Sequence, residues 1–166
     1  MLVDIPSGTK CFIDSNIFFY HLAAVISDVA LSNTCSDFLK RISKGEVVAM
    51  TSTVSAAEAT HKVMLAEAKV RYDAKLNAPR LQKQRHLIAT LTQHKQVAEL
   101  IRSLKVHVEP ISLNLLERAA DISTQSQLLT NDALTVAVME KLRLMDIATN
   151  DDDFDSVAHL TVWKPR

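Results

Sequence analysis

A chain of 166 residues that is 48% hydrophobic has enough apolar material for one globular domain and is not a disordered chain. Its 19 basic and 19 acidic residues cancel, but residues 62–105 carry ten Lys/Arg and three Asp/Glu, whereas residues 109–155 carry three Lys/Arg and ten Asp/Glu. This separation of charge hints at a polyanion partner or a cation site, although two solvated helix faces explain it more simply.

Several classes of protein are disfavoured. The two cysteines, Cys11 and Cys35, have no CxxC or Cys/His zinc spacing, so we expect a reducing compartment and no disulfide framework. The N-terminus lacks the charge pattern of a signal peptide, and the apolar run at residues 17–26 is too short to span a bilayer. We therefore expect a cytoplasmic protein that does not associate with a membrane.

Short apolar runs alternate with segments of helical spacing. In chain order, we predict a strand at 10–14, a helix from about 17, a helix at 35–44, a strand at 47–51, helices at 53–69 and 80–105, a strand at 106–111, helices at 113–125 and 131–142, and strands at 146–149 and 160–163. This alternation predicts an α/β fold with a central parallel sheet of four to five strands, flanked by helices on both faces.

Residues with special backbone or capping chemistry mark several boundaries. Ser15 and Asn16 are expected to cap the first helix, and Thr53 or Ser55 to begin the third. Pro79 suits the start of the long amphipathic helix at 80–105. Gly45 is expected directly after the second helix, and Pro110 favours an edge position for its strand.

Four acidic residues follow predicted strands or lie near the starts of predicted helices: Asp14, Glu58, Asp132 and Asp151. Each one alone is explained by capping or by the helix dipole. Capping is a weaker explanation for all four acids together, because these positions share one edge of a parallel α/β sheet, where ligands bind. Clustered carboxylates repel one another, and a hard divalent cation such as Mg²⁺ relieves that repulsion with oxygen ligands alone.

The acids lie in four segments, which read FIDSN (12–16), SAAE (55–58), LTNDA (129–133) and ATNDDDF (148–154). In this order the segments resemble the four motifs of the PIN domain, over about residues 10–163. Within that family the chain is most similar to the VapC toxins of VapBC toxin–antitoxin systems. The resemblance implies a PIN-like α/β fold and Mg²⁺- or Mn²⁺-dependent cleavage of RNA.

By match to the motifs, the catalytic acids that bind the metal are Asp14, Glu58, Asp132 and Asp151, with Asp153 as a further metal ligand. Asn16 and Thr149 match polar positions that hold these acids in place. The resemblance also implies one PIN domain over residues 1–166. Its basic helical segment, at about 62–105, is longer than the matching part of compact VapC toxins.

We expect the acids and their metal to hydrolyse phosphodiester bonds, with flanking RNA phosphates held by Arg71, Lys75, Arg80, Lys83 and Arg85. The toxin assignment implies a small antitoxin partner and a homodimer, to which the apolar run at 17–26 could contribute unless it is simply a buried helix. Three alternatives stay open: a solitary PIN nuclease for RNA processing, a structure-specific DNA nuclease, and a non-catalytic PIN-like nucleic-acid-binding module. A phosphatase of the haloacid-dehalogenase type is disfavoured, because Asp14 is not followed by a second aspartate two residues later.

Overall fold

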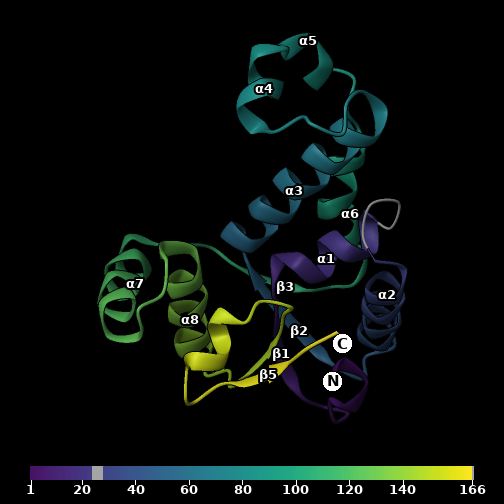
Figure 1. Cartoon of the computed structure of the whole chain (residues 1–166). Coiled ribbons are helices and arrows are strands. Elements are labelled where there is room, and N and C mark those ends of the chain that lie inside the picture. The colour runs from purple at the N-terminus through teal and green to yellow at the C-terminus, as the bar shows by residue number, and fades with distance from the viewer. Residues whose placement is uncertain (24–27, 166) are drawn as a thin grey trace.

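The computed structural model of the chain describes residues 1–23 and 28–165 (Figure 1). Within these residues, a parallel sheet has the strand order β3-β2-β1-β4-β5. Its strands are β1 (Lys10–Ile13), β2 (Val48–Ser52), β3 (His107–Glu109), β4 (Asp146–Ala148) and β5 (Thr161–Trp163). The predicted parallel sheet is confirmed, and β3, which precedes Pro110, lies at an edge as expected.

Helices cover both faces of the sheet, as predicted (Figure 1). The α-helices are α1 (Ser15–Leu22), α2 (Val29–Ser43), α3 (Thr53–Arg71), α4 (Ala78–Lys83), α5 (Arg85–Ile88), α6 (Gln96–Ser103), α7 (Leu113–Ser126) and α8 (Thr130–Leu142). Short 3-10 helices are η1 (Leu2–Asp4), η2 (Gln93–Lys95) and η3 (Asp153–Ser156). Among the described helices, none combines the length and the apolar composition needed to cross a bilayer.

The alternation of side chains along β1 divides the core in two. Cys11 and Ile13 face α1, α2, α3 and α6, whereas Phe12 faces α7 and α8. All three side chains are fully buried. A segment buried on both faces disfavours polar residues, which explains why residues 11–13 are all apolar and why the next polar side chain, Asp14, lies just beyond the end of the strand.

Two helix starts differ from the prediction because aspartate side chains cap them. The Asp14 carboxylate accepts a hydrogen bond from the Ser15 backbone N–H at 2.6 Å, so α1 begins at Ser15 rather than near Ile17. In the same way Asp28 caps α2, which begins at Val29, six residues before the predicted start at residue 35.

The prediction of one long helix over residues 80–105 is wrong. This stretch contains most of α4, all of α5, η2 and α6, and breaks between them. The buried Glu67 side chain of α3 accepts hydrogen bonds from the backbone N–H groups of Thr92 and Gln93, both at 2.9 Å. Because these donors are satisfied by a side chain distant in sequence, the chain can end one helix and begin another at this point.

Residues 71–95 form a projection at the far end of α3, here called the arm (Figure 1). A small apolar cluster of Ala68, Leu76, Leu81 and Leu91 holds the arm to α3. Within the apolar run at residues 17–26, Ile17 and Phe18 are fully buried in the main core, which fits the buried-helix interpretation for that part. Residues 24–26 of the run lie outside the described residues.

Candidate active site

Asp14 lies at the carboxyl edge of the sheet, where the neighbouring strands β1 and β4 both end. Ile13 and Ala148 are partners in the parallel register, and the Asp14 backbone N–H donates to the Ala148 carbonyl at 3.1 Å. The residues that follow these partners, Asp14 and Thr149, therefore lie side by side. This edge is the place where parallel α/β sheets bind ligands.

Three hydrogen bonds hold the Asp14 carboxylate, which is 8% exposed. One oxygen accepts from Ser15 N at 2.6 Å, and the other accepts from Asn16 Nδ2 at 2.5 Å and Thr149 Oγ1 at 2.8 Å. Burial raises the pKa of Asp14, while the hydrogen bonds from Thr149 and Ser15 oppose that rise. Asn16 and Thr149 thus fix the orientation of a carboxylate that burial alone would protonate more easily.

Glu58 reaches the same edge from α3, which continues directly from β2. Ser52, rather than Thr53 or Ser55, caps this helix by accepting a hydrogen bond from Ser55 N at 3.0 Å. The Glu58 carboxylate forms an ion pair with Lys62 one turn later, at 2.7 Å.

Asp132 lies in the first turn of α8, and its pKa reflects the charges around it. Burial, and then repulsion by other carboxylates, raises the pKa of Asp132 to about 6. In order of decreasing effect, these carboxylates belong to Asp151, Asp153, Asp14 and Glu58. The acids that the motifs single out therefore surround one region, although they come from four separate segments of the chain.

The fourth acidic segment follows β4 as a tight turn. The Asp151 backbone N–H donates to Thr149 Oγ1 at 3.0 Å, and Asp151 Oδ1 accepts from Asp153 N at 3.0 Å. Lys164 donates to the Asp151 carbonyl at 2.7 Å and so ties this turn to the segment after β5. Phe154 is fully buried against α7 and α8, which anchors the turn to the core.

The donor set suits a hard divalent cation, since it consists of carboxylate oxygens. Within residues 1–23 and 28–165, however, no three acidic, histidine or cysteine side chains are close enough together to enclose a metal ion. The carboxylates influence one another electrostatically but stand apart. Other groups hold three of them: hydrogen bonds hold Asp14, the Asp153 backbone N–H holds Asp151, and Lys62 holds Glu58.

The predicted RNA-binding residues lie on and beside the arm, away from the acids (Figure 1). Lys75, Lys83 and Arg85 are exposed. Arg71 is engaged in the structure of the arm, because its Nη1 donates to Glu67 at 3.0 Å and to the Thr90 carbonyl at 2.6 Å. Arg80 is exposed and donates to the Lys75 carbonyl at 3.2 Å.

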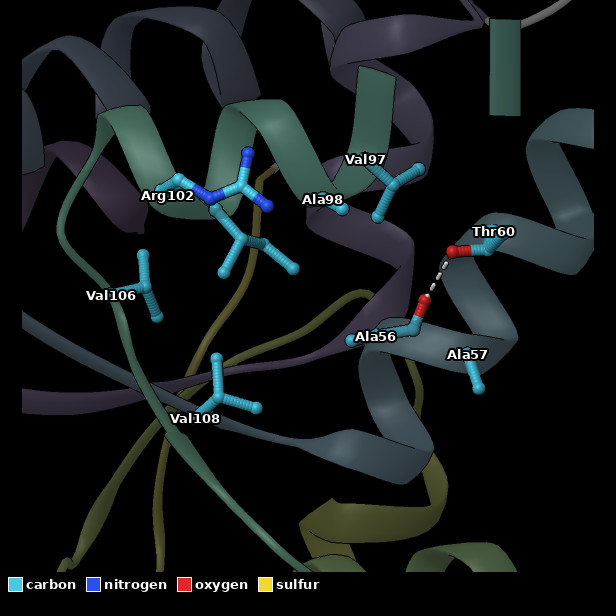
Figure 2. Close-up of a pocket in the computed structure, with 9 residues that line it drawn as sticks. Ala56, Ala57, Thr60, Val97, Ala98, Arg102, Val106 and Val108 are labelled. Atoms are coloured by element: carbon cyan, nitrogen blue, oxygen red, sulfur yellow. Dashed lines mark hydrogen bonds between the residues drawn. The ribbon is translucent and has the colours of Figure 1, made fainter. Parts of the chain in front are cut away.

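A separate groove of about 440 Å³ lies between α3, α6 and β3 (Figure 2). Its lining is mainly apolar, with Ala56 and Thr60 on α3 facing Val97 and Arg102 on α6. The Thr60 hydroxyl already donates to the Ala56 carbonyl at 2.8 Å. Among the described residues, those that line this groove include no carboxylate, so it is distinct from the acidic site.

Sequence reasoning missed two lysines of the site. Lys62 contacts Glu58 and also donates to Ser15 Oγ at 3.2 Å, while Lys164 holds the Asp151 turn. The spacing of Glu58 and Lys62, four residues apart on a predicted helix, is a signal that could have identified the first. No comparable local signal marks Lys164, which follows a different strand.

A family model described as "PIN domain" matches residues 11–160. VapC20 of Mycobacterium tuberculosis, described as a sarcin–ricin loop cleaving toxin, is similar in structure, with 20% identity, a TM-score of 0.60, and coverage of 89% of this chain and 94% of that one. A toxin–antitoxin complex from Klebsiella pneumoniae contains a similar chain, with 16% identity, a TM-score of 0.52, and coverage of 94% and 98%. No curated protein sequence matches significantly. Since the family model covers most of the sequence, the chain belongs to the PIN domain family.

Proposed function

We propose that this protein is a metal-dependent endoribonuclease that acts as the toxin of a toxin–antitoxin pair. The observation that carries this proposal is the convergence of acids on Asp132, whose pKa is raised by burial and by four other carboxylates. A site that gathers more negative charge than its positive partners balance costs stability unless it binds a cation. Such a site, in a PIN domain and at the ligand-binding edge of the sheet, supports a nuclease.

The residues that would hold Mg²⁺ or Mn²⁺ are Asp14, Glu58, Asp132 and Asp151, with Asp153 as a further ligand. When bound, such an ion activates water and neutralises charge on the phosphate and the leaving oxygen. The protein itself contributes orientation. Asn16 and Thr149 direct the Asp14 carboxylate, and the Thr149 hydroxyl also accepts a hydrogen bond from the Asp151 backbone N–H, which ties the turn after β4 to the same edge. Asp132 would have to lose its proton, so activity is expected to fall below about pH 6.

RNA is the proposed substrate, and the arm is proposed to hold it. Lys75, Lys83 and Arg85 present positive charge that can neutralise phosphates without reading sequence. We propose an antitoxin partner and a homodimer on the basis of the likeness to VapC toxins. The solved relative from Klebsiella pneumoniae is described as a toxin–antitoxin complex, which supports the first of these.

The test is cleavage of RNA in Mg²⁺ by the Asp14→Asn variant. Asparagine is as good a helix cap as aspartate, so α1 should still form while the charge is lost. We expect cleavage to fall at least about 100-fold. The exposed Asp121 on α7 provides the control, and Asp121→Asn should cleave normally. Undiminished cleavage by Asp14→Asn would contradict the proposal, and cleavage of single-stranded DNA but not RNA would contradict the choice of substrate.

A further inference from the structure

Lys62 lies beside two of the acids of the candidate active site, Glu58 and Asp14. Its ammonium group lies 2.7 Å from Glu58 Oε1 and 3.2 Å from Ser15 Oγ, so it bridges α3 and the start of α1. The residue next to Ser15 is Asp14, and the charge of Lys62 also acts on that carboxylate. The side chain is 38% exposed, which leaves room for it to move toward solvent.

The position of this ammonium group bears on metal binding, because a lysine and a divalent cation need the same carboxylate oxygens. A carboxylate that forms a close ion pair with lysine has part of its binding capacity already used. The like charges of ammonium and metal also repel at short distance. As described above, the acids stand apart in this structure, and Glu58 is the one that a cationic side chain holds.

We propose that Lys62 is an internal counter-ion of the active site, which neutralises Glu58 in the metal-free protein and must release it when a divalent cation binds. Lys62 therefore stabilises the metal-free site and weakens its affinity for metal. This inference rests on the proposed function, since it assumes that Glu58 is a metal ligand.

The test is titration of purified protein with Mg²⁺, and separately with Mn²⁺, by isothermal titration calorimetry. The variant Lys62→Met removes the charge but keeps an apolar side chain of similar length. We expect its dissociation constant for metal to be about three- to tenfold lower than that of the unaltered protein, as expected for a partly exposed charge interaction. Its melting temperature without metal should be lower, and the rise in melting temperature on adding metal should be larger.

Two control variants separate this role from others. Lys62→Arg keeps the positive charge and should bind metal no more tightly than the unaltered protein. Lys69→Met removes an exposed lysine from the same helix and should bind metal normally. If Lys62→Met unfolds, Lys62→Gln provides the same loss of charge with a polar side chain.

The outcomes distinguish this inference from the proposed function. A lower melting temperature for Lys62→Met with an unchanged or weaker affinity for metal would show a purely structural lysine and would overturn the inference alone. Failure of the unaltered protein to bind either metal would overturn both the inference and the metal-dependent activity. Tighter binding by Lys62→Met, with both controls unchanged, would support both.

Discussion

Helix α3 carries two glutamates whose surroundings are opposite. Glu67 has a side chain only 2% exposed, and it accepts hydrogen bonds from Arg71 Nη1 and from two backbone N–H groups of the arm. Glu58, nine residues earlier, is 33% exposed, pairs with a single lysine and lies among other carboxylates that it repels. One acid is buried and satisfied, and the other is accessible and crowded by like charge.

The difference shows that burial of a charge does not by itself mark a functional site. A buried carboxylate must be paired or hydrogen-bonded to be tolerated, and Glu67 meets that requirement entirely within the protein. Its role is to join the arm to α3. Glu58 is compensated only in part, because Lys62 pairs with it while repulsion from Asp14 and Asp132 remains in the metal-free protein. Negative charge in excess of its positive partners, rather than burial, distinguishes the candidate active site.

The largest expected effect is on the free energy of unfolding, when Glu67 and Glu58 are each changed to glutamine in separate variants. In Glu67→Gln, the new amide cannot accept all three hydrogen bonds, so the free energy of unfolding should fall by about 2–3 kcal/mol. In Glu58→Gln, loss of the exposed ion pair is offset by relief of repulsion, and the change should stay within about 1 kcal/mol. Urea unfolding without metal, followed by circular dichroism, measures both. An equal loss in the two variants would mean that Glu58 is also structural.

The fold was largely predictable because its signals are local. Apolar runs of strand length, together with the helical spacing of apolar residues in the segments that form α3 and α8, indicated most elements in the right order, although the capping residues of α1 and α3 were predicted one or more positions too late. The arm was not predictable, because its breaks depend on Glu67, which lies 25 residues from Thr92 along the chain. The apolar residues of this stretch suggest one stripe along a single helix, but in the structure they belong to two apolar clusters. Leu91 packs with Ala68 in the cluster that holds the arm, whereas Ile101 belongs to the main core.

The candidate site was predictable in its acids and less so in what surrounds them. The order of the four motifs selects the acids. Because ligands bind at the carboxyl ends of the strands in parallel α/β sheets, the acids were expected at that edge. Mutual repulsion among the acids was expected from the sequence, but not that Asp132 is the acid whose pKa rises to about 6, because that shift depends first on burial and then on acids from other segments. The contact of Lys62 with Ser15 is also tertiary, across 47 residues.

A smaller effect is expected from pH, and it tests whether the acidic site is under electrostatic strain. The pKa of Asp132 is raised from 3.8 to about 6 in the folded protein, so the folded state holds this proton more tightly than the unfolded state. The metal-free protein should therefore lose stability as pH rises between these two values, by about 1–2 kcal/mol after allowance for solvent screening. Asp132→Asn should remove this loss and be more stable than the unaltered protein near neutral pH.

Urea unfolding at about pH 4 and about pH 7.5 measures this contribution. The difference between Asp132→Asn and the unaltered protein should be small at the lower pH and clear at the higher one. Asp121→Asn should show no such dependence. A stability difference that is the same at both pH values would indicate that packing, rather than charge, determines the effect of Asp132.

The smallest expected effect is on the binding of RNA, at the other end of α3, where the arm is proposed to hold the substrate. Thirteen residues separate Glu58 from Arg71, or about 20 Å along the helix, so the arm can contact only RNA that flanks the cleaved bond. Changing Lys75, Lys83 and Arg85 together to glutamine should reduce the salt dependence of RNA binding by about 0.7 per lost phosphate contact. Because the acids are untouched, KM for long RNA should rise several-fold while kcat stays the same. Lys44→Gln, at the opposite edge of the sheet, is the single-site control. A large fall in kcat would mean that the arm does more than hold RNA, since binding that is equal in the ground and transition states changes only KM.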